Sequence, residues 1–149
     1  MPANTKDAQA GKQLHIHVIN DTPEILDVFR MVLGDEGYRV TTDRFTTELM
    51  PKVDHIRTLT PDLLVLDLIV NGEAAGWQLL QLLKMDRETR AIPIVICTAA
   101  VRTVDELRSH LDAMGIKVVL KPFDIDHLID VIKSVIADDE LPVRLERDE

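Results

Sequence analysis

The chain has 149 residues, 46% hydrophobic and 29% charged, which is typical of one globular domain with a substantial core. A net charge of −9 and only five aromatic residues (one Trp, one Tyr, three Phe) argue against a nucleic-acid partner, which needs a basic or base-stacking surface. The sequence contains no apolar run of membrane-spanning length and no signal-peptide core, so we expect a cytoplasmic protein without a membrane partner. The single Cys97 cannot form an internal disulfide, which fits a reducing compartment.

The two ends differ in composition from the middle of the chain. Residues 1–13 are polar and lack periodicity, which predicts a flexible leader. Residues 14–137 alternate apolar strand and helix patterns and form the expected domain. Residues 138–149 are an acidic tail, too short for a further domain.

The first half of this domain predicts two strands, each followed by a helix. Residues 14–19 form an apolar strand, and Thr22-Pro23 then has the N-cap and first-turn preferences of a helix start. Gly37 ends that helix, residues 38–42 form the second strand, and Thr46 or Thr47 opens the second helix. Helical spacing predicts that the buried face of the first helix contains Ile25, Val28, Phe29, Val32 and Leu33.

The segment Pro61-Asp62-Leu63-Leu64-Val65-Leu66-Asp67 is the centre of the pattern. Four consecutive apolar residues predict a strand buried on both faces, with Asp67 at its solvent-facing carboxyl end. The carboxyl ends of strands in open parallel sheets are where ligands bind. Taken alone, Asp67 could equally cap the loop that follows.

The second half continues the alternation. A loop over residues 71–76 precedes a helix from Trp77 to about Met85, and residues 92–97 form the fourth strand, ending at Thr98. A helix begins at about Thr103, residues 117–120 form the fifth strand before Lys121, and Asp124 caps the last helix.

Five strands alternating with five helices predict an α/β fold, a doubly wound parallel sheet covered on both faces by right-handed crossovers. The flavodoxin-like order 2-1-3-4-5 fits this pattern and brings Asp21 and Asp67 to the switch point between the first and third strands. Thr98 and Lys121 end the next two strands. Carboxylate oxygens suit Mg²⁺, a lysine suits a phosphate oxygen, and a carboxylate can itself accept a phosphoryl group.

Four segments in this order resemble the response-regulator receiver domain over residues 14–137: Val18-Ile19-Asn20-Asp21, residues 61–67, Cys97-Thr98-Ala99 and Lys121-Pro122-Phe123. The resemblance implies that Asp67 accepts a phosphoryl group from the phosphohistidine of a histidine kinase. It also implies the Mg²⁺ ligands, namely Asp21, Asp67, the Ile69 backbone carbonyl and, through water, Asn20. Thr98 and Lys121 would hold the phosphoryl oxygens.

The same resemblance implies the partners. They are a sensor histidine kinase or phosphotransfer protein, and a target protein docking on the fourth helix, fifth strand and fifth helix; a homodimer is compatible with it. No organic cofactor is expected, and no enzyme activity beyond self-phosphorylation and slow self-dephosphorylation.

This chain departs from the family at several positions. Asn20 replaces the first of two acids, the loop after Asp67 is about one residue longer and lacks a proline, and Val118 replaces a switch aromatic. The resemblance also implies that the residues two positions beyond Asp67 and Thr98 border the path of hydrolytic water, and these are Ile69 and Ala100.

These departures favour one rival, a degenerate receiver that binds proteins independently of phosphate. Two other rivals fit less well. A flavin protein would need a phosphate-cradling loop after the first strand, and an aspartyl phosphatase would need a second acid where Ile69 stands.

Two histidines of the first strand, His15 and His17, share one face at a spacing that can bind a transition metal. The sequence shows no third ligand near them. Packing histidines are therefore the favoured interpretation.

Overall fold

The strands and helices alternate as the sequence predicts. The computed structural model describes residues 13–45, 48–69, 73–122 and 124–140. The strands are β1 (His15–Asn20), β2 (Arg39–Arg44), β3 (Leu63–Leu66), β4 (Ile94–Thr98) and β5 (Lys117–Leu120). The helices are α2 (Pro23–Asp35), α3 (Leu49–Leu59), α4 (Ala75–Met85), α5 (Val101–Ala113) and α6 (Ile125–Glu140).

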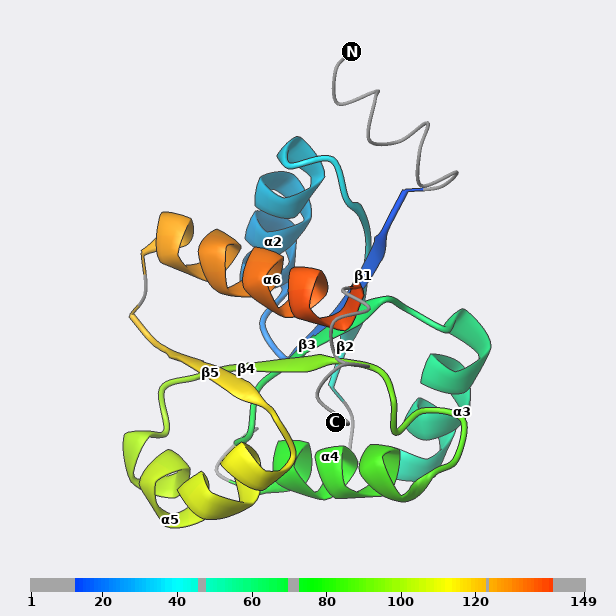
Figure 1. The fold of residues 1–149 in the computed structure, drawn as a ribbon, viewed down its shortest axis with the longest axis vertical. Helices are drawn as coiled ribbons and strands as arrows, with labels where there is room; N and C mark the ends of the chain where they lie inside the picture. The colour runs from blue at the N-terminus through cyan, green and yellow to red at the C-terminus, as the bar shows by residue number, and fades with distance from the viewer. Residues whose placement is uncertain (1–12, 46–47, 70–72, 123, 141–149) are drawn as a thin grey trace, which may run out of the picture.

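The sheet is parallel throughout and has the order β2-β1-β3-β4-β5, so the predicted doubly wound, flavodoxin-like topology is confirmed. Helices α2 and α6 cover one face, and α3, α4 and α5 cover the other (Figure 1). Ile19 on β1 pairs with Leu66 on β3, so Asn20 and Asp67 follow directly at the carboxyl edge. The sheet therefore brings the predicted polar residues to one edge.

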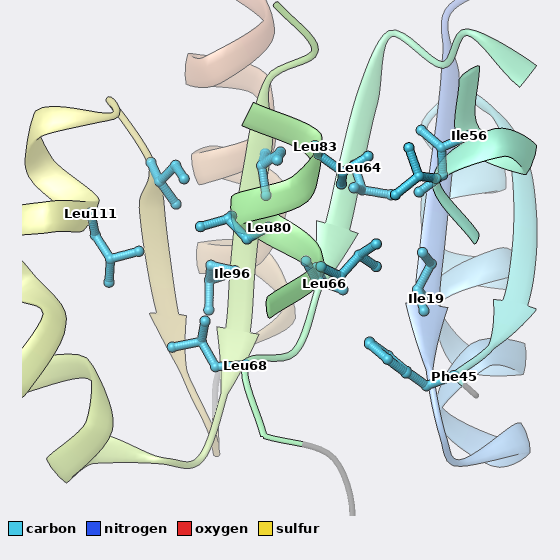
Figure 2. Close-up of a cluster of buried hydrophobic side chains, with 14 of the residues drawn as sticks. Ile19, Phe45, Ile56, Leu64, Leu66, Leu68, Leu80, Leu83, Ile96 and Leu111 are labelled. Atoms are coloured by element: carbon cyan, nitrogen blue, oxygen red, sulfur yellow. The ribbon is translucent and has the colours of Figure 1, made fainter. Parts of the chain in front are cut away.

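Alternate residues of the central strands fill two separate cores. On β3, Leu64 and Leu66 face α3, α4 and α5, whereas Leu63 and Val65 face α2 and α6. Figure 2 shows the first of these cores, with Ile56, Leu80 and Leu111 packed against the sheet. Burial on both faces explains why β3 is continuously apolar.

Several sequence predictions need correction. On α2 the buried residues include Leu26, whereas Val28 is 42% exposed, because the helix is rotated slightly from the predicted face. Helix α4 begins at Ala75, so Gly76, predicted to lie in the loop, is helical. Helix α5 begins at Val101 rather than Thr103.

Some predictions fall outside the described residues. These are residues 1–12 of the leader, the helix start at Thr46 or Thr47, residues 70–72 of the lengthened loop after Asp67, and residues 141–149 of the tail. Within the described part, α3 begins at Leu49 with Glu48 as its N-cap residue, and α6 continues to Glu140. Across the described helices, none combines the length and apolarity needed to span a membrane.

Candidate functional site at the carboxyl edge of the sheet

Asp67 follows β3 directly, and its side chain is 14% exposed. Its two carboxylate oxygens have different partners. Lys121 Nζ lies 3.2 Å from Oδ2, and the Ile69 backbone N–H donates to Oδ1 at 3.2 Å. The carboxylate is thus held at the sheet edge by a cation from the end of β5 and by its own loop.

Thr98 and Lys121 are held together by the backbone. The Lys121 N–H donates to the Thr98 carbonyl at 2.9 Å, where the ends of β4 and β5 meet. The Thr98 hydroxyl is buried and accepts the Ala100 N–H at 3.2 Å. That bond uses the hydroxyl oxygen as an acceptor and leaves its O–H available as a donor.

The end of β1 supplies an amide and an acid. Asn20 is buried, and its Oδ1 accepts the Thr22 N–H at 2.9 Å. Asp21 is partly exposed, and its carboxylate accepts the Thr22 hydroxyl at 3.3 Å. Asn20 therefore orders the turn into α2, while within the described residues only the Thr22 hydroxyl bonds to the Asp21 carboxylate, which leaves most of its lone pairs free.

Gly76 is a residue of the site that the sequence did not reveal. Its N–H donates to the Leu68 carbonyl at 3.0 Å, and the Trp77 N–H donates to the same oxygen at 3.2 Å. A Cβ at Gly76 would overlap the Asp67 carbonyl oxygen and lie 2.8 Å from Leu68 Cα. Only glycine lets α4 pack this closely on the backbone that carries Asp67. In the sequence, the one signal of this close approach is a glycine just before a helical pattern.

Cys97 lies one residue before Thr98 and is buried. Burial raises its pKa to about 12, more than Lys121 lowers it, so the thiol stays protonated at neutral pH. Cys97 is therefore a small residue of the hydrophobic core, and the chemistry of the edge rests on oxygen and lysine groups.

The donor set suits Mg²⁺, which prefers hard oxygen ligands and retains several waters. Asp21 and Asp67 lie at the ends of adjacent strands and could offer carboxylate oxygens to such an ion, and Ile69 could offer its main-chain carbonyl. Asn20 contributes no charge, because an amide replaces a carboxylate there.

A doubly wound domain with acids, a threonine and a lysine at the carboxyl edge of a 2-1-3-4-5 sheet has the receiver form of the flavodoxin-like fold. The chain belongs to the response regulator receiver domain family, whose sequence model matches residues 16–133. Receiver domains of this family serve two-component signalling.

Individual relatives agree with this assignment. The chain is 28% identical over 123 residues to the polar-differentiation response regulator DivK of Brucella ovis, covering 83% of this chain and 96% of DivK. The chemotaxis protein CheY4 of Vibrio cholerae has a similar fold, with a TM-score of 0.67 at 19% identity, covering 83% and 98% of the two chains.

A third similar structure is the receiver domain of a Pseudomonas aeruginosa sensor histidine kinase, described with a magnesium ion coordinated in its active-site cleft. Its TM-score is 0.66 at 21% identity, and the match covers 84% of this chain and 98% of that one.

Proposed function

We propose that this receiver domain is a phosphoacceptor protein, on which Asp67 takes a phosphoryl group from the phosphohistidine of a histidine kinase or phosphotransfer protein. The observation that carries the proposal is the 3.2 Å contact between Asp67 Oδ2 and Lys121 Nζ at the carboxyl edge of the sheet. An ammonium beside a partly exposed carboxylate is placed to bind the anionic phosphoryl group that the carboxylate receives.

The transfer replaces one bond to phosphorus by another. An Asp67 carboxylate oxygen forms the new O–P bond while the N–P bond of the phosphohistidine breaks, and the imidazole nitrogen leaves with the bonding electron pair. Lys121 would donate to one phosphoryl oxygen, and the Thr98 hydroxyl would donate its hydrogen to another. These donors would replace the present Lys121–Asp67 contact.

A bound Mg²⁺ would be held by Asp21, Asp67 and the Ile69 carbonyl, with Asn20 contributing through water. Its charge would offset that of the incoming phosphoryl group. The side chains of Asp21 and Asp67 are partly exposed, so the carboxyl edge of the sheet is accessible to an incoming phosphoryl group.

Output to a downstream target would pass through the surface formed by α5, β5 and α6, the fourth helix, fifth strand and fifth helix of the described chain. β5 is an edge strand with α5 and α6 on either side of it (Figure 1). Val101 is 48% exposed and Leu120 is 38% exposed there, and Leu120 is adjacent to Lys121. A change in the position of Lys121 would therefore occur one residue away from this surface.

Intact-mass measurement after incubation with acetyl phosphate and Mg²⁺ tests the acceptor. We expect one phosphoryl group on the wild type, none on Asp67→Asn, and one on the matched control Asp105→Asn, which removes an exposed carboxylate of α5. Phosphorylation of Asp67→Asn to the wild-type extent would contradict the assignment.

A phosphate-independent binding module is the second candidate, and two observations favour it. Asn20 is already hydrogen-bonded within its own turn, and Val118 is a small, stiff side chain packed on the core. Amide chemical shifts with and without beryllofluoride separate the candidates. Changes extending from Thr98 into α5 support switching, whereas changes confined to the edge support the binding module.

A further inference from the structure

A second polar cluster lies beneath α3, on the face of the sheet that α3 covers. His17 comes from β1, Asp43 from β2 and His55 from α3. One side-chain ligand atom from each lies within 4.8 Å of the other two. Asp43 Oδ2 is 4.0 Å from His17 Nε2 and 4.0 Å from His55 Nε2.

His17 has an unsatisfied nitrogen directed into this cluster. Its side chain is 1% exposed, and Nε2 is the only buried side-chain nitrogen or oxygen within the described residues that has no hydrogen-bond partner. Buried polar atoms are nearly always paired, so an unpaired one calls for a ligand or another explanation. The nearby Lys52 ammonium is not the missing partner of His17 Nε2, because the ammonium bonds Asp43 Oδ2 at 2.8 Å and the Arg44 carbonyl at 3.0 Å.

Thr41 fixes the other nitrogen of His17. Its hydroxyl oxygen lies 2.6 Å from His17 Nδ1 and 2.7 Å from His15 Nε2. A hydroxyl donates one hydrogen, so Thr41 can donate to His15 while accepting from His17 Nδ1–H. This arrangement leaves a lone pair on His17 Nε2, and a histidine oriented through its second nitrogen in this way is typical of metal ligands.

The acid–base state of His17 is consistent with that arrangement. Burial lowers its pKa to about 4, outweighing the Asp43 carboxylate, which raises it, while His55, His15 and Lys52 lower it further. The ring is neutral at physiological pH, as a metal ligand must be.

We propose that His17, Asp43 and His55 form a binding site for a divalent transition metal ion of the zinc type. Two imidazoles and one carboxylate are a recognised zinc donor set that leaves a fourth position for water. Bonds of about 2.0–2.1 Å in a tetrahedral site separate the ligand atoms by about 3.3 Å, so each nitrogen must approach Asp43 Oδ2 by about 0.7 Å. His55, with a side chain 50% exposed, provides the route of entry.

This site is separate from the edge at Asp67 and does not depend on phosphorylation. His15, named from the sequence as a companion of His17, does not belong to the ligand set. It bonds Thr41 and thereby positions His17.

Lys52 provides a variant whose effect on metal binding should be opposite to that of removing a ligand. Its ammonium occupies Asp43 Oδ2, so a metal ion must compete with it for the carboxylate. Removing the ammonium should tighten metal binding, whereas removing a ligand should weaken it. A purely structural ion pair would show no such opposite response.

The test is a Zn²⁺ titration of the untagged, EDTA-stripped full chain, in competition with a chromophoric chelator. We expect one ion per chain, binding at least about 100-fold weaker in His55→Ala, since loss of an outer-shell partner alone costs 10–100-fold. His127→Ala, an exposed histidine on α6, is the matched control and should bind as the wild type. Lys52→Met should bind on the order of tenfold tighter.

Ring-nitrogen NMR of the same samples identifies the ligands without requiring a variant of the buried His17. Zn²⁺ should shift Nε2 of His17 and His55, and leave His127 unchanged. Wild-type affinity in His55→Ala, weaker binding in Lys52→Met, or zinc binding that is lost only in Asp67→Asn would each overturn the proposal.

Discussion

Replacing Gly76 by alanine tests how closely α4 must approach the phosphoacceptor strand. The added Cβ would overlap the Asp67 carbonyl oxygen, and it would lie 2.7 Å from the carbonyl carbon. Ordinary carbon–carbon contacts are about 3.5–4.0 Å. The first turn of α4 must therefore move away by about 0.8 Å or more, because the obstructing atoms belong to the backbone.

Opposing terms decide the sign of the effect. Alanine favours a helix over glycine by about 1 kcal/mol. The displacement weakens two hydrogen bonds to the Leu68 carbonyl, at 3.0 and 3.2 Å, each contributing about 1 kcal/mol. Overpacking adds about 1–3 kcal/mol. We expect a net loss of about 3 kcal/mol in the free energy of unfolding, together with slower phosphorylation at Asp67.

Urea denaturation provides the measurement, and Gly34→Ala provides the control. Gly34 lies in α2, and a Cβ added there would meet no other group within 4 Å among the described residues, so only the helix propensity changes. We expect Gly34→Ala to stabilise the chain by about 0.5–1 kcal/mol. With a slope of about 1–3 kcal/mol/M, Gly76→Ala should lower the urea midpoint by about 1 M or more. Equal or greater stability of Gly76→Ala would refute the close-approach explanation.

Three further predictions concern the two polar clusters. Asn20→Asp should lower the dissociation constant for Mg²⁺ by about tenfold, because the carboxylate adds a negative charge and keeps the oxygen that accepts the Thr22 N–H. An unchanged dissociation constant in a Mg²⁺ titration would count against this. Ile69→Asn should speed the loss of the phosphoryl label by up to about tenfold, because one added hydrogen bond of about 1.4 kcal/mol would orient the attacking water. If the label decays equally fast or more slowly with Mg²⁺ in excess, another residue governs the lifetime of the phosphoryl group. The pKa of His17 is about 4 in the folded chain and 6.5 in the unfolded chain, so the unfolded chain binds a proton first as the pH falls. About 3 kcal/mol of the free energy of unfolding, present in full above pH 6.5, should therefore be lost as the pH falls to 4. Urea titrations in EDTA should show this slope in the wild type and a flatter one in His17→Gln; parallel slopes would contradict it.

Much of the fold could be predicted because the relevant signals are local. The unbroken apolar run of β3 is set by burial on both faces, and polar residues collect where such a strand ends. Asp67, Thr98 and Lys121 each lie at the end of a strand, and a parallel sheet must bring these strand ends to one edge. The fold therefore followed from the order of these segments, although element boundaries shifted by one to three residues.

The close approach at Gly76 could not be predicted in this way. A glycine before a helical pattern reads as a loop residue, since glycine disfavours helices. It is helical here because the hydrogen bonds to Leu68 and the contact with the Asp67 backbone outweigh that preference. Those partners become neighbours only when α4 packs on the sheet.

The sequence by itself determined that the chain is a doubly wound α/β domain with an acid at the end of its central strand, because strand and helix periodicities and strand-end residues are written locally. Only the tertiary structure decided that His17 meets Asp43 and His55. The register that pairs His17 with Thr41 places Asp43 two residues further along β2, and the packing of α3 adds His55. Side-chain periodicity gives the face on which a residue lies, but the partner across two elements depends on register and helix packing, which long-range contacts set.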